Sequence, residues 1–145
     1  MKFKLTINKE KEETVEATLH SEGDFAYQLE ELVRGYNGED SITAFTEDDI
    51  KVLKYGEIEY ITVMDSKTYA VTASGERYRL KMRLYELSEI LPGYFIKINK
   101  STLANKRRIE KFSAAFSGSV DVIFKSGSRD YVSRRCFSEI KKELK

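Results

Sequence analysis

The stretch SGSVDVIFKSGSRDYV, residues 117–132, decides the fold class because it places two short strands and two turns within 16 positions. Apolar and polar side chains alternate from Ser119 to Phe124 and again from Arg129 to Val132, which is the period of a half-buried β-strand. Ser117-Gly118 and Ser126-Gly127 are the residue types that form turns between such strands. The stretch therefore predicts short strands joined by tight turns, rather than strands that alternate with long helices.

The same pattern covers most of the chain from residue 41 onward. Further strands are predicted at Ile50–Leu53, Ile58–Met64, Thr68–Thr72, Arg77–Lys81, Tyr94–Ile98 and Ile109–Phe116, with a turn at Ser74-Gly75. One short helix is predicted over Met82–Ile90, stopped by Pro92-Gly93, and another from Arg134 to about Leu144 with Ser133 as its N-cap. Eight or nine strands with two or three short helices make the chain mainly β, in the α+β class. Neither a GxGxxG motif nor a P-loop occurs, which disfavours a nucleotide-binding α/β fold.

Residues 1–44 differ from the rest and are predicted to form a small acidic N-terminal extension of strands and one helix. Lys2–Ile7 and Thr14–Leu19 alternate polar and apolar side chains, so each is expected to be a strand. Ser21 is the candidate N-cap of a helix over about Gly23–Arg34, with Gly35 as its C-cap. The apolar residues of this helix are expected to pack against the first strands: Phe25, Leu29, Leu32 and Val33. Gly38 and Glu39–Ser41 are interpreted as a linker.

Charge is distributed unevenly in this chain. A length of 145 residues with 41% hydrophobic residues suits one domain with its own core. The net charge of the whole chain is only +1. Residues 1–45 hold 5 Lys/Arg and 10 Asp/Glu, whereas residues 46–145 hold 20 and 14. From Tyr94 onward, 13 basic residues stand against 5 acidic ones. A polyanionic partner is therefore expected at the C-terminal part of the chain.

The residue types needed for most catalytic and metal sites are scarce. The chain has one cysteine, Cys136, so it cannot form an internal disulfide. It has one histidine, His20, and one of each residue is too few for most zinc sites and for the usual Ser/His and Cys/His catalytic arrangements. We therefore predict no enzyme activity, no metal and no cofactor. The first residues hold no apolar run of the kind that a signal peptide needs, and no stretch is apolar enough to span a membrane. A cytoplasmic location without membrane insertion is expected.

Two basic segments are the candidates for binding chemistry. The first is Tyr94–Ile109, where cations and hydrogen-bonding side chains follow an apolar strand. The second is Tyr131–Phe137, where Arg134 and Arg135 begin a helix, a position that is unfavourable for the helix dipole and so suggests a role other than helix stability. Lys and Arg bind phosphates or guanine edges, and Asn and Ser bind phosphates or bases. The alternative for the first segment is an ordinary solvated loop.

These segments resemble a known family. The runs YFIKINKSTLANKRRIEKF (94–112) and SGSVDVIFKSGSRDYVSRRCFSEIKKEL (117–144), preceded by EIEYITVMDSKTYAV and RLYELSEILPG, are similar to a LytTR-type DNA-binding domain over about residues 45–143. Four signatures have counterparts in the right order: Glu57-Ile58-Glu59-Tyr60-Ile61, Leu84 to Leu87 with Pro92, Ser101 to Asn105, and Ser133-Arg134-Arg135. The resemblance implies a fold of small antiparallel sheets, with residues 45–145 as the DNA-binding domain.

The resemblance also implies site residues. Loops, rather than a recognition helix, would enter successive major grooves of double-stranded DNA. By position, Lys67, Lys100 and Arg135 would contact bases, and a second set would hold the DNA backbone or the loops themselves: Asn99, Ser101, Asn105, Lys106, Arg107 and Arg134. Many family members have His followed by Arg or Lys where this chain has Asn99-Lys100, so the resemblance leaves the base preference open.

Three of the candidate site residues have a simpler interpretation. Lys67 could be a hairpin lysine that faces water. Arg135 could form a surface ion pair with Glu139, four residues later on the same helix. Asn105 could bond only the backbone of its own turn.

The leading hypothesis is a transcriptional regulator that binds direct repeats as a homodimer. The residues before the resemblance are too few for a receiver domain, so control through a receiver in this chain is not expected. Short members of the family include some that are controlled by a membrane-protein partner, and the resemblance implies such a partner here. The second hypothesis is a protein-interaction module, in which the N-terminal extension docks a partner or masks the basic face.

Overall fold

The computed structural model describes residues 1–36 and 41–143, and these form three α-helices, ten β-strands and two 3-10 helices. The helices are α1 (Asp24–Arg34), α2 (Leu84–Ile90) and α3 (Arg134–Glu143), with the 3-10 helices η1 (Tyr55–Glu57) and η2 (Lys106–Arg108). The strands are β1 (Ser41–Phe45), β2 (Ile50–Lys54), β3 (Ile58–Met64), β4 (Lys67–Thr72), β5 (Arg77–Leu80), β6 (Phe95–Asn99), β7 (Thr102–Asn105), β8 (Ile109–Ala114), β9 (Val120–Phe124) and β10 (Arg129–Val132). The mainly β, α+β prediction is confirmed.

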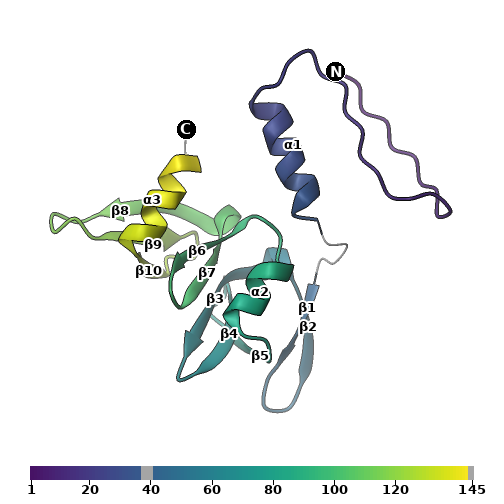
Figure 1. Cartoon of the computed structure of the whole chain (residues 1–145). Helices are drawn as coiled ribbons and strands as arrows, with labels where there is room; N and C mark the ends of the chain where they lie inside the picture. Colours follow the sequence, from purple (N-terminus) through teal and green to yellow (C-terminus); the bar gives the residue numbers. More distant parts are fainter. Residues whose placement is uncertain (37–40, 144–145) are drawn as a thin grey trace.

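The strands form two antiparallel sheets (Figure 1). The larger sheet has seven strands in the order β2-β1-β5-β4-β3-β7-β6, and the smaller has three in the order β10-β9-β8. The predicted turn glycines connect neighbouring strands, and Gly75, Gly118 and Gly127 have φ values of 86°, 84° and 94°. Glycine reaches this left-handed region without steric cost, so these positions fix where each hairpin turns.

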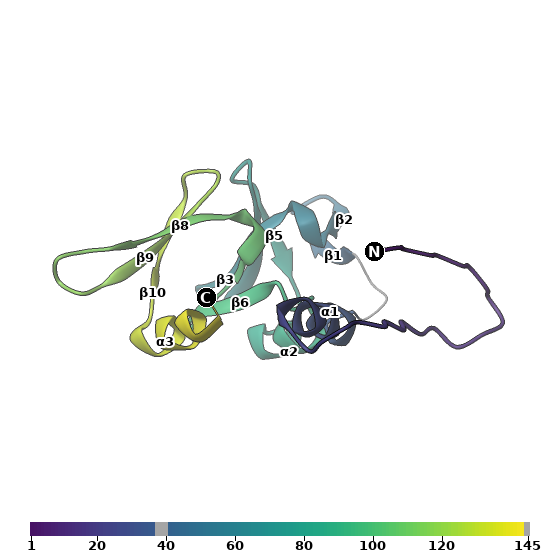
Figure 2. The same cartoon turned by 90° about the horizontal axis from the view of Figure 1, so that it is seen from above.

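Two hydrophobic cores meet at β7. Successive side chains of a strand point to opposite faces, so Leu103 joins the core that includes Leu87 of α2, and Ala104 joins the core that includes Ile140 of α3. Both residues are almost fully buried. The helices α2 and α3 lie along the same side of the molecule, as Figure 2 shows. One strand therefore anchors both halves of the domain.

Polar contacts also connect the two sheets. Glu59 of β3 is fully buried, and its carboxylate accepts hydrogen bonds from the hydroxyl of Ser126 and, at 3.3 Å, from the Ser126 amide. The Arg108 guanidinium donates to the carbonyl oxygen of Gly56 at 2.7 and 3.0 Å. Tyr60 stacks on Phe124 with ring centroids 5.0 Å apart. The β9–β10 turn is thereby held against the start of β3.

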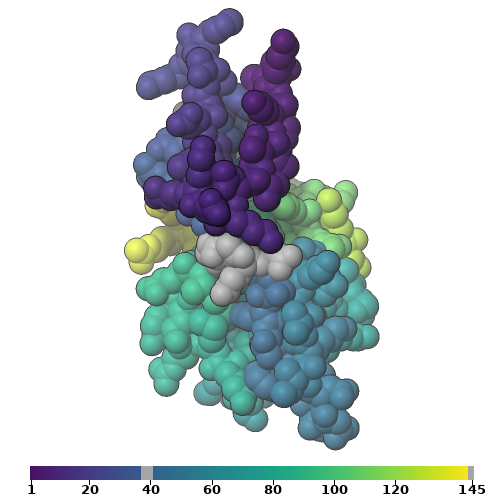
Figure 3. All heavy atoms as spheres, turned by 90° about the vertical axis from the view of Figure 1, so that its right-hand side faces the viewer, coloured from purple at the N-terminus to yellow at the C-terminus, as the bar shows by residue number. Residues whose placement is uncertain are grey.

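The N-terminal extension differs most from its prediction. Residues 1–23 form no strand, so the two strands expected at Lys2–Ile7 and Thr14–Leu19 are absent, because a lone pair of short strands is marginally stable without a third strand or a packed helix. The helix α1 forms as predicted and ends at Gly35, but its N-cap is Gly23 rather than Ser21, and it buries no residue. The expectation that its apolar face packs against strands is therefore wrong. Figure 3 shows residues 1–36 as a projection from the body of the molecule.

Smaller corrections concern element positions. β1 was not predicted because Ser41–Phe45 is short. β7 was not predicted because Thr102–Asn105 does not alternate polar and apolar side chains, and all four of these residues are buried. α2 begins at Leu84 rather than Met82, with Arg83 as its N-cap. The predicted linker falls at Gly38–Asp40, which lies outside the described residues, and Ser41 opens β1.

Candidate nucleic-acid interface

Lys67 follows a tight turn at one end of the large sheet. Asp65 and Ser66 have φ values of 51° and 64°, as in the turns that join two-residue β-hairpins, and Lys67 pairs with Met64 across that hairpin. Its side chain is exposed. The turn is short and closed on both sides by strand pairing, so it presents the lysine from a rigid support.

Lys100 lies in the β6–β7 turn, and the turn is shaped by the buried side chain of Asn99. Asn99 is 1% exposed. Its Oδ1 accepts a hydrogen bond from the amide of Ser101, and its Nδ2 donates to the carbonyl oxygen of Tyr131, both at 2.9 Å. The buried Asn99 side chain therefore stabilises the turn through hydrogen bonds, while the side chain of Lys100 is exposed to solvent.

Arg134 and Arg135 occupy the first two positions of α3, where the chain leaves β10. The predicted N-cap is confirmed, because Ser133 Oγ accepts a hydrogen bond from the amide of Cys136 at 3.2 Å. The amide of Ser133 in turn donates to the carbonyl oxygen of Ile98 in β6, at 2.8 Å. Both arginines are exposed. The helix start is thus fixed directly against the strand that leads into the Lys100 turn.

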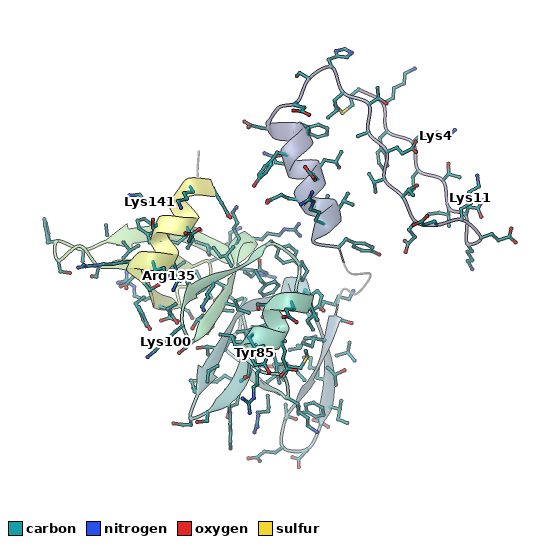
Figure 4. The ribbon with its side chains drawn as sticks, viewed as in Figure 1. Lys4, Lys11, Tyr85, Lys100, Arg135 and Lys141 are labelled. Atoms are coloured by element: carbon teal, nitrogen blue, oxygen red, sulfur yellow. The ribbon has the colours of Figure 1, made fainter. Side chains whose placement is uncertain are left out.

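Hydrogen bonds bring these three segments together. The carbonyl oxygen of Ser101 accepts from the amide of Val63 at 2.9 Å, near the β3–β4 turn that carries Lys67. The hydroxyl of Thr102 donates to Asp130 of β10 at 2.9 Å and lies 2.9 Å from the hydroxyl of Thr62. Lys100 and Arg135 accordingly come from adjoining elements in Figure 4. Three exposed cations therefore share one end of the domain on a hydrogen-bonded support.

Asn105, Lys106 and Arg107 lie at the other end of β7. Asn105 is 1% exposed, donates to the carbonyl oxygen of Ile58 at 2.9 Å and accepts from the amide of Arg107 at 3.0 Å, so its side chain caps η2. The Arg107 guanidinium lies 4.0 Å from the ring centroid of Tyr94. A four-residue strand separates this group from the Lys100 turn by roughly 10 Å. These three residues thus lie apart from the Lys100 turn, whereas Arg135 of α3 lines the same open cleft as Lys106 and Arg107.

Sequence reasoning missed several residues that build this region. Thr102 and Asp130 tie the turns together, and nothing in their spacing along the chain signals that contact. Arg77 is exposed and its guanidinium lies 3.9 Å from the sulfur of Met64, beside the Lys67 turn. On the neighbouring face, burial raises the pKa of Tyr60 above its ordinary value, and the charge of Glu59 adds to that shift.

The structure bears on two of the simpler interpretations, the Arg135–Glu139 ion pair and the contacts of Asn105. Within the described residues Arg135 forms no ion pair, and Glu139 lies 3.5 Å from Lys142 instead. The guanidinium of Arg135 is therefore available to a ligand. Asn105 bonds the backbone of its own turn at Arg107 and also the carbonyl oxygen of Ile58 in β3, so its contacts are structural but extend beyond that turn, and its burial leaves no exposed face for a phosphate.

No group of three or more His, Cys, Asp and Glu side chains in residues 1–36 and 41–143 is placed to hold a metal ion. None of the helices described is both long and apolar enough to cross a membrane.

Comparisons with known proteins agree with the architecture. A family model described as the LytTr DNA-binding domain matches residues 48–145. A relative from Staphylococcus aureus strain MSSA476, described as the uncharacterized HTH-type transcriptional regulator SAS2254, is 30% identical over 99% of this chain and 98% of its own length. SAR2449 of strain MRSA252, which has the same description, is 29% identical over the same shares. The solved LytTr DNA-binding domain of a methyl-accepting/DNA response regulator from Bacillus cereus has a TM-score of 0.69 at 24% identity, covering 74% of this chain and 98% of that one.

Proposed function

Because the chain belongs to the family of LytTr DNA-binding domains, we propose that it is a transcriptional regulator that binds specific sequences in double-stranded DNA through three loops rather than through a recognition helix. The observation that carries this proposal is the placement of Lys67, Lys100 and Arg135 on three segments that hydrogen bonds hold together at one end of the domain. Strands separate the three described helices from one another, so a helix-turn-helix pair does not occur among residues 1–36 and 41–143.

The chemistry of the three cations assigns them different tasks. Arg135 can donate two parallel hydrogen bonds to O6 and N7 of a guanine, whereas Lys67 and Lys100 act as single charges that suit one acceptor each. Arg134, exposed beside Arg135, is placed to contact a phosphate. Asn99, Ser101 and Asn105 support the loops through the hydrogen bonds described above. Lys106 and Arg107 add phosphate contacts at the far end of β7.

The proposal extends to assembly. The part of the chain from Ser41 onward would bind DNA, since β1 and its buried Ala44 belong to the larger sheet and shift the expected boundary from residue 45 to residue 41, and residues 1–36 would regulate or dimerise. The protein would bind direct repeats as a homodimer in the cytoplasm, under the control of a partner that, in this family, can be a membrane protein.

Selection from a random duplex pool at two salt concentrations tests the proposal directly. Enrichment of paired short motifs spaced by about one helical turn is expected, because loops on two copies would then meet the same face of the duplex. A pool that shows no enrichment at either salt concentration contradicts sequence-specific binding.

A second prediction concerns Lys106. The substitution Lys106→Ala should weaken binding to selected and unrelated duplexes by the same factor, because a phosphate contact carries no sequence information. It should also reduce the slope of log Kd against log salt concentration by about 0.9, the effect of one phosphate contact. Fluorescence anisotropy titrations on both duplexes measure these quantities. A loss confined to the selected duplex would instead place Lys106 at a base.

The masking hypothesis has one supporting observation. Glu31 of α1 lines the same open cleft as Lys106, Arg107 and Arg135, so one acidic side chain of the N-terminal extension lies near these cations. Deleting residues 1–40 is then expected to tighten binding to a duplex with a single motif at low salt, since the deletion removes a competing negative charge. Unchanged affinity of the folded truncated chain would reject masking.

A further inference from the structure

The exposed apolar side chains of the molecule gather in the N-terminal extension. Of 15 large apolar residues that are exposed in the described chain, ten lie within residues 1–36. Single exposed apolar residues are ordinary on a protein surface, but a concentration of this kind marks an interaction site. Neither hydrophobic core includes a residue from this region.

These side chains form matching stripes on three segments. On the first arm (residues 1–9) they occupy alternate positions at Phe3, Leu5 and Ile7, and on the second arm (residues 10–19) at Val15, Ala17 and Leu19. On α1 they recur at helical spacing: Phe25, Leu29, Leu32, Val33 and Tyr36. Each arm thus has one apolar face, as a strand that packs under an amphipathic helix has.

A turn joins the arms, but the arms do not pair as strands within the described chain. The chain turns at Lys9-Glu10 and bends at Lys11, and the amide of Glu10 donates to Asn8 Oδ1 at 3.0 Å. Because residues 1–23 form no strand, the backbone groups of both arms are not used in a ladder. Each arm can therefore accept a partner strand from another chain.

The arms carry opposite charges. The first arm has three lysines, Lys2, Lys4 and Lys9, and no acidic residue, whereas the second has four glutamates and one lysine. Figure 4 labels Lys4 and Lys11, one on each arm. Opposite charges on facing strands stabilise their pairing, and like charges oppose it. The arms therefore favour a basic arm beside an acidic one.

Resting on the homodimer of the proposed function, we propose that residues 1–36 are its dimerisation unit and that their partner is the same segment of a second copy of this chain. The basic arm of each copy pairs antiparallel with the acidic arm of the other, and the apolar stripes of the two α1 helices cover the shared apolar face. At roughly 100 Å² for each side chain, the exposed apolar residues of one copy would bury about 800 Å², which is the area that a stable interface needs from each partner. These residues are Phe3, Leu5, Ile7, Val15, Phe25, Leu32, Val33 and Tyr36.

Sedimentation equilibrium of the full chain without DNA tests the assembly and is independent of whether the protein binds DNA. The full chain is expected to form a dimer at micromolar concentration. Leu5→Glu and Phe25→Glu should each raise the dimer dissociation constant about tenfold or more, because a charge then enters an apolar interface. Val52→Glu is the matched control, since Val52 is an exposed apolar residue of the edge strand β2. The melting temperature of the domain should stay the same in all three variants.

A charge-exchange experiment tests whether the arms pair between chains. Chains with Lys2→Glu and Lys4→Glu, and chains with Glu13→Lys and Glu16→Lys, should each dimerise about tenfold more weakly than the original at low salt. Mixing the two variants should restore a tight heterodimer, because each modified arm then meets an arm of opposite charge. Pairing within a chain predicts no recovery on mixing.

Three results would overturn the proposal. The first is a full chain that stays monomeric at tens of micromolar. The second is dissociation caused by Val52→Glu rather than by Leu5→Glu, which would assign the interface to β2. The third is a mixture of charge variants that remains as weak as its components.

Discussion

Arg135→Ala is expected to weaken binding to the selected duplex by about 5- to 150-fold, which corresponds to about 1–3 kcal/mol for one bidentate contact with guanine. Arg135 is exposed at the second position of α3, and the only acid at helical distance, Glu139, lies beside Lys142. The substitution therefore removes a group that is unpaired within the described chain, and little compensation is expected. Discrimination between the selected duplex and variants of its guanine should flatten at the same time.

The matched control is Lys141→Ala on the same helix. It removes one positive charge near the other end of α3, where Figure 4 labels Lys141, so the two variants have the same net charge. Lys141→Ala should change affinity by less than about threefold on any duplex, as expected for a distant, screened charge. Anisotropy titrations of both variants on matched and mismatched duplexes separate the two cases. Equal losses for the two variants would show that Arg135 contributes only charge.

Asn99→Ala is expected to lower stability and DNA affinity together. The substitution leaves the amide of Ser101 and the carbonyl oxygen of Tyr131 without their partner in a site that is 1% exposed. Two half-buried polar groups that lose their hydrogen bonds cost about 1–2 kcal/mol together, or about 5–15 °C in Tm for a domain of this size. Because Asn99 also joins the Lys100 turn to β10, affinity for the selected duplex should fall about tenfold even well below Tm.

Asn8→Ala supplies the comparison for this variant. Asn8 is exposed in the N-terminal extension and bonds only its own turn among the described contacts. Its replacement should leave Tm and DNA affinity unchanged. Thermal unfolding followed by circular dichroism, with anisotropy measured at low temperature, gives both quantities. An Asn99→Ala chain that melts early yet binds with full affinity would make Asn99 a residue of stability alone.

Much of the fold could be predicted from local patterns. Alternating strands with a Ser-Gly turn between them, such as β9 and β10, follow from side-chain period and glycine conformation, and both elements were found. β7 was missed because Thr102 and Asn105 are polar residues in buried positions, and only contacts with distant Asp130 and Ile58 make burial favourable. Tertiary partners of that kind leave no trace in local sequence.

The same limit applies to the site. Ser133 could be predicted as an N-cap because its bond to the Cys136 amide spans three residues. The role of Asn99 within the fold depends on Tyr131, which is 32 positions away. The prediction for the N-terminal extension failed for a different reason. Its local patterns are strong, but an apolar face is buried only against a partner, and the single chain does not supply one.

The contact between Glu59 and Ser126 lies beside a core that both sheets share, and this has a consequence for how the domain comes apart. Detaching the smaller sheet would break the hydrogen bonds from Ser126 to Glu59 and expose to water the core that Ile98 and Ala104 share with Val122 and Phe124. Partial opening between the sheets is therefore costly, and the two sheets should unfold as one cooperative unit. Lys67 on one sheet and Arg135 beyond the other then keep a fixed separation until the whole domain melts, so the spacing between the DNA contacts is as durable as the fold itself.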